Sequence, residues 1–217
     1  MFFIKPSALL FIDGSNFYHS LKFQNDLPFD ETGYAHLFKE LSNHFDLKEI
    51  NFYDAIKDRI RDPNGYARQQ QFHARFKNID SRVKIKTRKL RYALSISKER
   101  SNEVAKGVGL ASSLTDKLYL FLKKLNVVKH SHEKGLDILL IVDVLEAHRD
   151  KKVDKLILLS GDSDYVPAVE FMQRAGAKLV NLHTFSGSSK ELRDACFEHM
   201  LIDVDLSGKI TLARSKK

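Results

Sequence analysis

Short runs of apolar residues recur along the chain, and polar residues end each of them. The runs are too short for most helices and do not alternate, which is typical of strands buried on both faces of a sheet. They predict strands over 7–13, 49–55, 153–160 and 177–182. Two further strands are predicted over 82–92, where cations alternate with smaller residues, and over 127–128.

Between these runs, apolar residues recur at three- and four-residue spacing, as on one face of a helix. This pattern predicts helices over 16–24, 34–45, 135–148, 165–175 and 188–199, and a polar helix over 66–78 follows the turn sequence of 62–65. Strands that alternate with helices are typical of the α/β class. We therefore predict a mainly parallel central sheet with helices on both faces.

The composition adds bounds to this picture. The chain has 217 residues and 43% of them are hydrophobic, which suits one domain with a sizeable core and excludes disorder as its main state. We predict a single domain over 1–206 with an insertion over 93–124, and a short basic tail over 207–217. No apolar run approaches the ~20 residues that a membrane span needs. The single cysteine, Cys196, excludes a disulfide scaffold and fits a reducing compartment such as the cytoplasm.

The charge is concentrated in one segment. The formal net charge is +8, yet residues 57–100 hold 14 Lys and Arg against 4 Asp and Glu. This segment therefore carries +10 and the rest of the chain carries −2. A basic segment beside a mildly acidic body favours a polyanionic partner.

Acidic residues follow two of the predicted strands. Asp13 ends the first apolar run, three residues before Asn16, and Asp162 and Asp164 follow Ser160 at the end of another. Because the carboxyl ends of parallel strands meet at one edge of a sheet, these carboxylates are expected to converge there.

Asp137 lies at the start of a predicted helix and can point to the same edge of the sheet, with Lys134 as a nearby cation. Clustered carboxylates repel, by about 4 kcal/mol for two charges at about 4 Å and an effective dielectric of about 20. Oxygen ligands without cysteine favour a hard ion, Mg²⁺ or Mn²⁺. Such a site can orient a water and stabilise charge on a phosphodiester.

Each acid also has a simpler interpretation. Asp13 before glycine can merely form a turn. Asp162 or Asp164 can cap the helix that follows, and Asp137 suits the dipole of its helix. Asp143, within an apolar helix face, suits a structural hydrogen-bond acceptor. The joint occurrence of the acids at predicted strand ends favours the functional interpretation.

Three blocks together resemble the NYN domain, in the LabA-like branch of the PIN-like nucleases, over roughly 7–203. The blocks are Phe11-Ile-Asp-Gly-Ser-Asn-Phe17, Lys134-Gly-Leu-Asp137 with Asp143, and Ser160-Gly-Asp-Ser-Asp-Tyr-Val-Pro167. The resemblance implies a three-layer α/β/α PIN-like fold and metal-dependent ribonuclease activity. It implies acidic metal-site residues at Asp13, Asp137, Asp162 and Asp164, with Asn16 and Ser160 in support. Asp143 matches a further family acid.

The basic segment contains a candidate nucleic-acid surface. In 82–88, cations occupy every second position, so Arg82, Lys84, Lys86 and Arg88 share one face of a strand. Lys89, Arg91 and Lys134 can extend this surface. The simpler alternative is a solvated edge strand, which its lysines protect from aggregation.

These features lead to three hypotheses. The first is a Mg²⁺- or Mn²⁺-dependent endoribonuclease that cleaves single-stranded RNA with a metal-activated water. The second is a non-catalytic RNA- or protein-binding module on the same fold. The third, a phosphatase of the haloacid-dehalogenase type, is disfavoured because Ser15 occupies the position of its second acid. RNA is the expected partner and a membrane is not. The sequence does not decide whether the protein forms a homodimer.

Overall fold

The computed structural model describes residues 4–25, 29–89, 91–94, 106–107, 109, 129–132, 135–205 and 210–215. The chain divides into two compact units. The main unit comprises Met1–Arg88 and Gly135–Lys217, and the second unit comprises Lys89–Lys134. The two units are described separately below.

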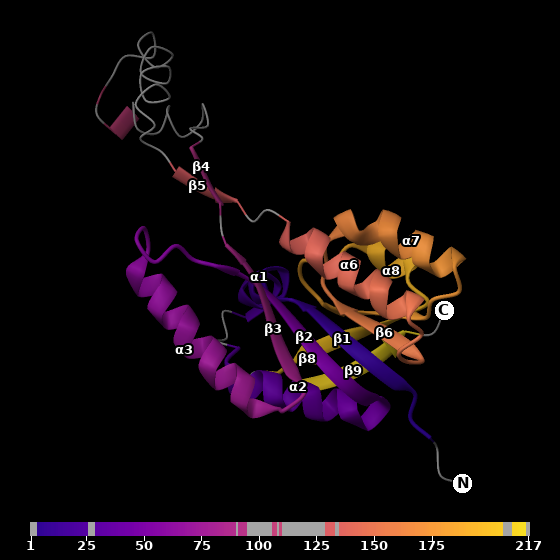
Figure 1. The fold of residues 1–217 in the computed structure, drawn as a ribbon. Helices are drawn as coiled ribbons and strands as arrows, with labels where there is room; N and C mark the ends of the chain where they lie inside the picture. The colour runs from indigo at the N-terminus through magenta and orange to yellow at the C-terminus, as the bar shows by residue number, and fades with distance from the viewer. Residues whose placement is uncertain are drawn as a thin grey trace. The chain divides into compact units, whose positions relative to one another are not determined.

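The main unit is built on a seven-stranded sheet with the order β3-β2-β1-β6-β7-β8-β9 (Figure 1). Strands β1, β2, β6, β7 and β8 are parallel along this order, and β9 is antiparallel to β8. The predicted α/β class with a mainly parallel sheet is therefore confirmed. The strands are β1 Ser7–Asp13, β2 Asp46–Ile56, β3 Val83–Lys89, β6 Lys155–Leu159, β7 Leu179–Thr184, β8 Glu198–Val204 and β9 Ile210–Ser215.

Helices cover both faces of this sheet. In Figure 1, α2 and α3 lie on one side and α6 and α7 on the other. The helices are α1 Gly14–Asn25, α2 Glu31–His44, α3 Pro63–Ile79, α6 Leu136–Arg149, α7 Val166–Arg174 and α8 Lys190–Ala195, and a 3₁₀ turn, η1, spans Ser163–Tyr165. The chain passes from one strand to its parallel neighbour through a helix, as parallel pairing requires.

Aromatic rings fill the core between α2, α3 and β2. The ring of Phe76 lies 4.6 Å from that of Phe52 and 4.7 Å from that of Tyr34, measured between centroids. All three side chains are buried. The Tyr34 pair is edge-to-face, the arrangement that adds attraction beyond burial of area. This packing fixes the helices against the strand that neighbours β1.

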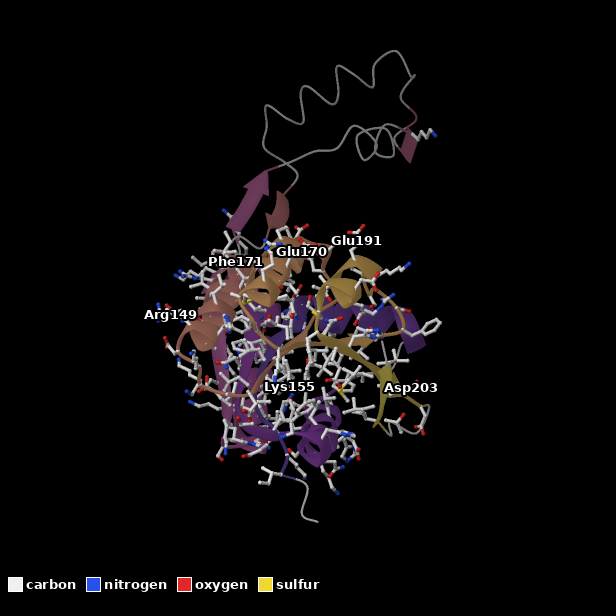
Figure 2. The ribbon with its side chains drawn as sticks, turned by 90° about the vertical axis from the view of Figure 1, so that its right-hand side faces the viewer. Arg149, Lys155, Glu170, Phe171, Glu191 and Asp203 are labelled. Carbon is white, nitrogen blue, oxygen red and sulfur yellow. The ribbon has the colours of Figure 1, made fainter. Side chains whose placement is uncertain are left out.

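Side chains also connect strands of the sheet at their amino-terminal ends. Lys155, labelled in Figure 2, forms an ion pair with Glu198 and lies over the rings of Phe45 and Phe197. The contact joins the beginnings of β6 and β8. Cys196 is buried beside this edge.

Two expectations for the C-terminal region are wrong. The helix predicted over 188–199 ends at Ala195, and β8 begins at Glu198. No glycine or proline lies between the two elements, so no residue of the sequence marks the boundary. Met200, Ile202 and Val204 are buried at the two-residue period of a strand. The expected tail 207–217 contains β9, which pairs with β8 and buries Ile210.

The strand predicted over 82–92 is two strands. Its first part is β3, and its second part, β4 (Arg91–Leu94), belongs to the second unit and pairs with β5 (Lys129–His132). Arg91 is opposite His132, and Leu94 is opposite Lys129. The expected insertion 93–124 falls within this unit. The strand expected over 127–128 lies outside the described residues. In the part of the chain that the structure describes, no helix is long and apolar enough to cross a membrane.

Candidate functional site

Asp13 ends β1 and is the most enclosed of the predicted acids, with 5% of its surface exposed. The parallel register aligns Ile12 with Leu159, so Asp13 and Ser160 emerge side by side from β1 and β6. The Ser160 hydroxyl donates to Asp13 Oδ2 at 3.0 Å, and the Asn16 backbone N–H donates to Asp13 Oδ1 at 3.1 Å. A buried carboxylate needs such donors to offset the loss of water.

The loop after β6 is held against the start of α1. The Gly161 N–H donates to Asn16 Oδ1 at 2.7 Å, which joins two segments 145 residues apart. A Cβ atom at position 161 would lie 1.8 Å from the carbonyl oxygen of Gly187. Gly161 therefore permits a close approach that no other residue allows. Asn16 and Ser160 are thus placed beside Asp13 as predicted.

Tyr165 connects two of the acids. Its hydroxyl lies 3.3 Å from Asp13 Oδ2 and 3.2 Å from Asp137 Oδ1. The tyrosine comes from η1, and Asp137 from the first turn of α6. Burial, and then the charges of Asp13 and Asp137, raise the pKa of Tyr165, so its hydroxyl keeps its proton. The structure therefore brings Asp13 and Asp137 to one shared hydrogen-bond donor.

The electrostatics link Asp137 to the other two acids. Desolvation of the Asp137 carboxyl raises its pKa, and the charges of Asp162 and Asp164 raise it further. The Tyr165 hydrogen bond opposes this shift. Asp162 and Asp164 therefore lie within electrostatic reach of Asp137 at the carboxyl edge of the sheet.

Asp162 also has the simpler role considered for it. Its Oδ1 accepts a hydrogen bond from the Asp164 N–H at 2.9 Å, so it caps η1. Its own N–H donates to the Ser160 hydroxyl at 3.2 Å. Asp164 is exposed in the first turn of η1.

The chemistry of these donors fits a hard divalent ion, since all of them are carboxylate oxygens and their charges repel one another. The pair that the structure brings to a common point is Asp13 and Asp137. Within the described residues, no three acidic, histidine or cysteine side chains are close enough together to hold an ion as they stand. Asp162 and Asp164 act on Asp137 through their charge.

Sequence reasoning missed two residues of this site. Tyr165 follows a capping sequence and was expected only to begin a helix. Asn181 lies fully buried in β7, where its Nδ2 donates to the carbonyl oxygens of Leu158 and Ser160 and so supports the end of β6. One polar residue within the apolar run Leu179–Leu182 was the available signal.

Asp143 lies in a separate network. The Tyr53 hydroxyl donates to Asp143 Oδ2 at 2.6 Å, and Lys86 Nζ lies 2.7 Å from the same oxygen. Burial, and then the Asp143 contact, raise the pKa of Tyr53. Asp143 therefore joins α6 to β2 and β3 and has the structural role that its helix position indicated.

The basic strand is largely paired. Arg82 pairs with Asp80 and lowers the pKa of that carboxyl, Lys84 pairs with Glu49, and Lys86 pairs with Asp143. Arg88 and Lys89 are exposed, and no carboxylate of the described residues lies within ion-pair distance of either. Arg91 is placed by its backbone in the second unit, and Lys134 lies outside the described residues. Three of the seven predicted cations, Arg82, Lys84 and Lys86, are thus paired with carboxylates of the main unit.

A mostly parallel sheet that gathers acids at its carboxyl edge is consistent with a PIN-like α/β fold. The chain belongs to the NYN domain family, whose model matches residues 7–203. NYN domains are generally nucleases, so the fold and the family agree.

Two further comparisons extend this assignment. A 58-residue segment is 34% identical to the uncharacterised protein y4oD of Sinorhizobium fredii, and it spans 26% of this chain and 27% of that relative. A crystal structure of a protein of unknown function from Vibrio parahaemolyticus matches with a TM-score of 0.58 and 19% identity. It covers 97% of this chain and 99% of its own, and it supports the fold alone.

Proposed function

We propose that the protein is a metal-dependent ribonuclease, in the LabA-like branch of its family, that hydrolyses phosphodiester bonds of single-stranded RNA with Mg²⁺ or Mn²⁺. The observation that supports this most strongly is the pairing of buried Asp13 with Asp137 through one hydroxyl. Two carboxylates that lie close together at a sheet edge repel, and a divalent cation bound by both would relieve this repulsion.

Each residue of the site has a separate role in this proposal. Asp13 and Asp137 would hold the ion, which would activate water and neutralise charge on the phosphate. Ser160 and Asn16 orient Asp13 through hydrogen bonds to its two oxygens. Asp162 and Asp164 add the negative charge that attracts a divalent cation.

RNA would meet the main unit at Arg88, and Lys89, the first residue of the second unit, follows it in β3. Lys84 pairs with Glu49, and Lys86 lies over the ring of Tyr53. Later residues of β3 therefore contact later residues of β2, as in a parallel pair. Because Asp13 is aligned with Tyr53, the end of β3 lies at the same sheet edge as Asp13. Contacts of Arg91 and Lys134 with RNA stay predictions. A reducing compartment for the protein also stays a prediction.

A non-catalytic RNA-binding module is the second candidate. The capping role of Asp162 favours it, because this bond accounts for that acid without a metal. The two candidates differ in turnover. A binding module would retain RNA in a salt-dependent manner and leave it intact when Mn²⁺ is added.

The test is cleavage of a labelled single-stranded RNA by the wild type with Mg²⁺, with Mn²⁺ and with a chelator. We expect cleavage that requires a divalent ion and falls by about a hundredfold or more in Asp137→Asn. Equal cleavage by the variant and the wild type would show that the activity comes from another site or a contaminant.

A further inference from the structure

The Tyr165 hydroxyl occupies the point where two carboxylates of the proposed metal site converge. It lies within hydrogen-bond distance of Asp13 Oδ2 and of Asp137 Oδ1, and the residue is 3% exposed. A phenol has one proton to donate. That proton serves two acceptors, so each acid relies in part on a donor that the other also uses.

The two acids depend on this hydroxyl unequally. Asp13 also accepts from Ser160 and from the Asn16 backbone, which leaves it well supplied with donors. In the described part of the chain, Tyr165 is the one hydrogen-bond donor to Asp137. Without the hydroxyl, Asp137 would experience the charges of Asp162 and Asp164 with no hydrogen-bond donor from the described part of the chain.

We propose that Tyr165 is a positioning residue that takes the place of a cation between Asp13 and Asp137. Its hydroxyl holds the two carboxylates together while no ion is bound, and it competes with a divalent ion for the same oxygens. This inference rests on the proposed function for its metal step, but the bridging step stands on the geometry alone.

The chain contains a matched control. Tyr53 is also a buried tyrosine whose hydroxyl donates to a carboxylate, that of Asp143. Asp143 keeps Lys86 as a partner when the Tyr53 hydroxyl is removed. Tyr53→Phe therefore makes the same chemical change as Tyr165→Phe, but at a hydroxyl that donates to Asp143 and not to Asp13 or Asp137.

The bridging step is tested by urea unfolding of the full chain in the presence of a chelator. Tyr165→Phe is expected to lower the folding equilibrium constant about tenfold, the effect of one hydrogen bond to a charged group. In an Asp137→Asn background, where the repulsion is gone, the same change should cost less than about threefold, since residues in contact are coupled. Equal losses in both backgrounds would overturn the proposal.

The competition is tested by titrating Mn²⁺ into each protein and following the free ion by electron paramagnetic resonance. Tyr165→Phe should bind Mn²⁺ about tenfold more tightly than the wild type, and Tyr53→Phe should bind it as the wild type does. Unchanged or weaker binding by Tyr165→Phe would overturn the competition. If the wild type and both variants bind no Mn²⁺, the proposed metal site fails, and the unfolding experiment still decides the bridge.

Discussion

The hydroxyl of Ser160 donates to the carboxylate of Asp13 across the junction of β6 and β1, 147 residues apart in the chain. The same hydroxyl accepts from the Asp162 N–H. One side chain thus connects the first acid of the site to the loop that carries Asp162 and Asp164.

Ser160→Ala should therefore lower the free energy of unfolding by about 1–3 kcal/mol, because it removes a donor from a buried carboxylate. Urea denaturation measures this loss. Ser20→Ala is the matched control, since the Ser20 hydroxyl is also buried but donates to the carbonyl of Phe17. A loss for Ser160→Ala no larger than that for Ser20→Ala would contradict the role given to this hydrogen bond.

Gly161→Ala should be more severe. The added methyl group would meet the backbone carbonyl of Gly187, which cannot move aside as a flexible side chain would. We expect a loss of at least about 2 kcal/mol in unfolding free energy and a displaced site loop. Gly107→Ala, where an added Cβ meets nothing within 4 Å, should unfold as the wild type does. Similar unfolding midpoints for the two variants would show that the loop accommodates the methyl group.

RNA binding should distinguish cations that have the same charge but different partners. Arg88→Gln should reduce the salt dependence of single-stranded RNA binding by about 0.7 in the slope of log K against log salt, as the loss of one phosphate contact does. Lys84→Gln should leave the slope unchanged, because Lys84 is already paired with Glu49. Fluorescence anisotropy at several salt concentrations measures both. An equal decrease of the slope for both variants would contradict this distinction and indicate that RNA contacts the paired cations of β3 as well.

A histidine pair gives the main unit a pH dependence. Burial lowers the pKa of His183 from 6.5 to about 4. Its Nδ1 donates to the Thr184 carbonyl, so its Nε2 accepts from His199 Nδ1 and has no place for a second proton. The unfolded chain therefore binds more protons than the folded one between pH 4 and 6.5.

Stability should accordingly fall as the pH drops from 6.5 towards 4, and His183→Gln should remove part of this fall. The measurement is the urea midpoint of both proteins at pH 7 and pH 4.5. A variant that loses as much stability as the wild type over this interval would show that His183 does not contribute.

The acidic edge of the sheet could be predicted from sequence because an apolar run followed by polar residues marks where a buried strand ends. Asp13, Ser160 and Asp162 were located in this way. The bridging role of Tyr165 could not be, since its two partners come from β1 and α6 and only the fold brings them together. The same reason hid the ion pairs of Lys84 and Lys86, whose partners lie on β2 and α6. Strand β8 was missed because no turn residue separates it from α8.

The central claim, a metal-dependent nuclease site at Asp13, is tested most directly by a matched pair of variants, Asp13→Asn and Asp143→Asn. Both replace a carboxylate that lies within hydrogen-bond distance of a tyrosine hydroxyl, but Asp13 belongs to the proposed site and Asp143 to the network with Lys86. The measurement is the rate of Mn²⁺-dependent cleavage of single-stranded RNA, at a temperature where both variants are folded. The account predicts a fall of about a hundredfold or more for Asp13→Asn and a rate within a few fold of the wild type for Asp143→Asn. Cleavage by Asp13→Asn at the wild-type rate would contradict it.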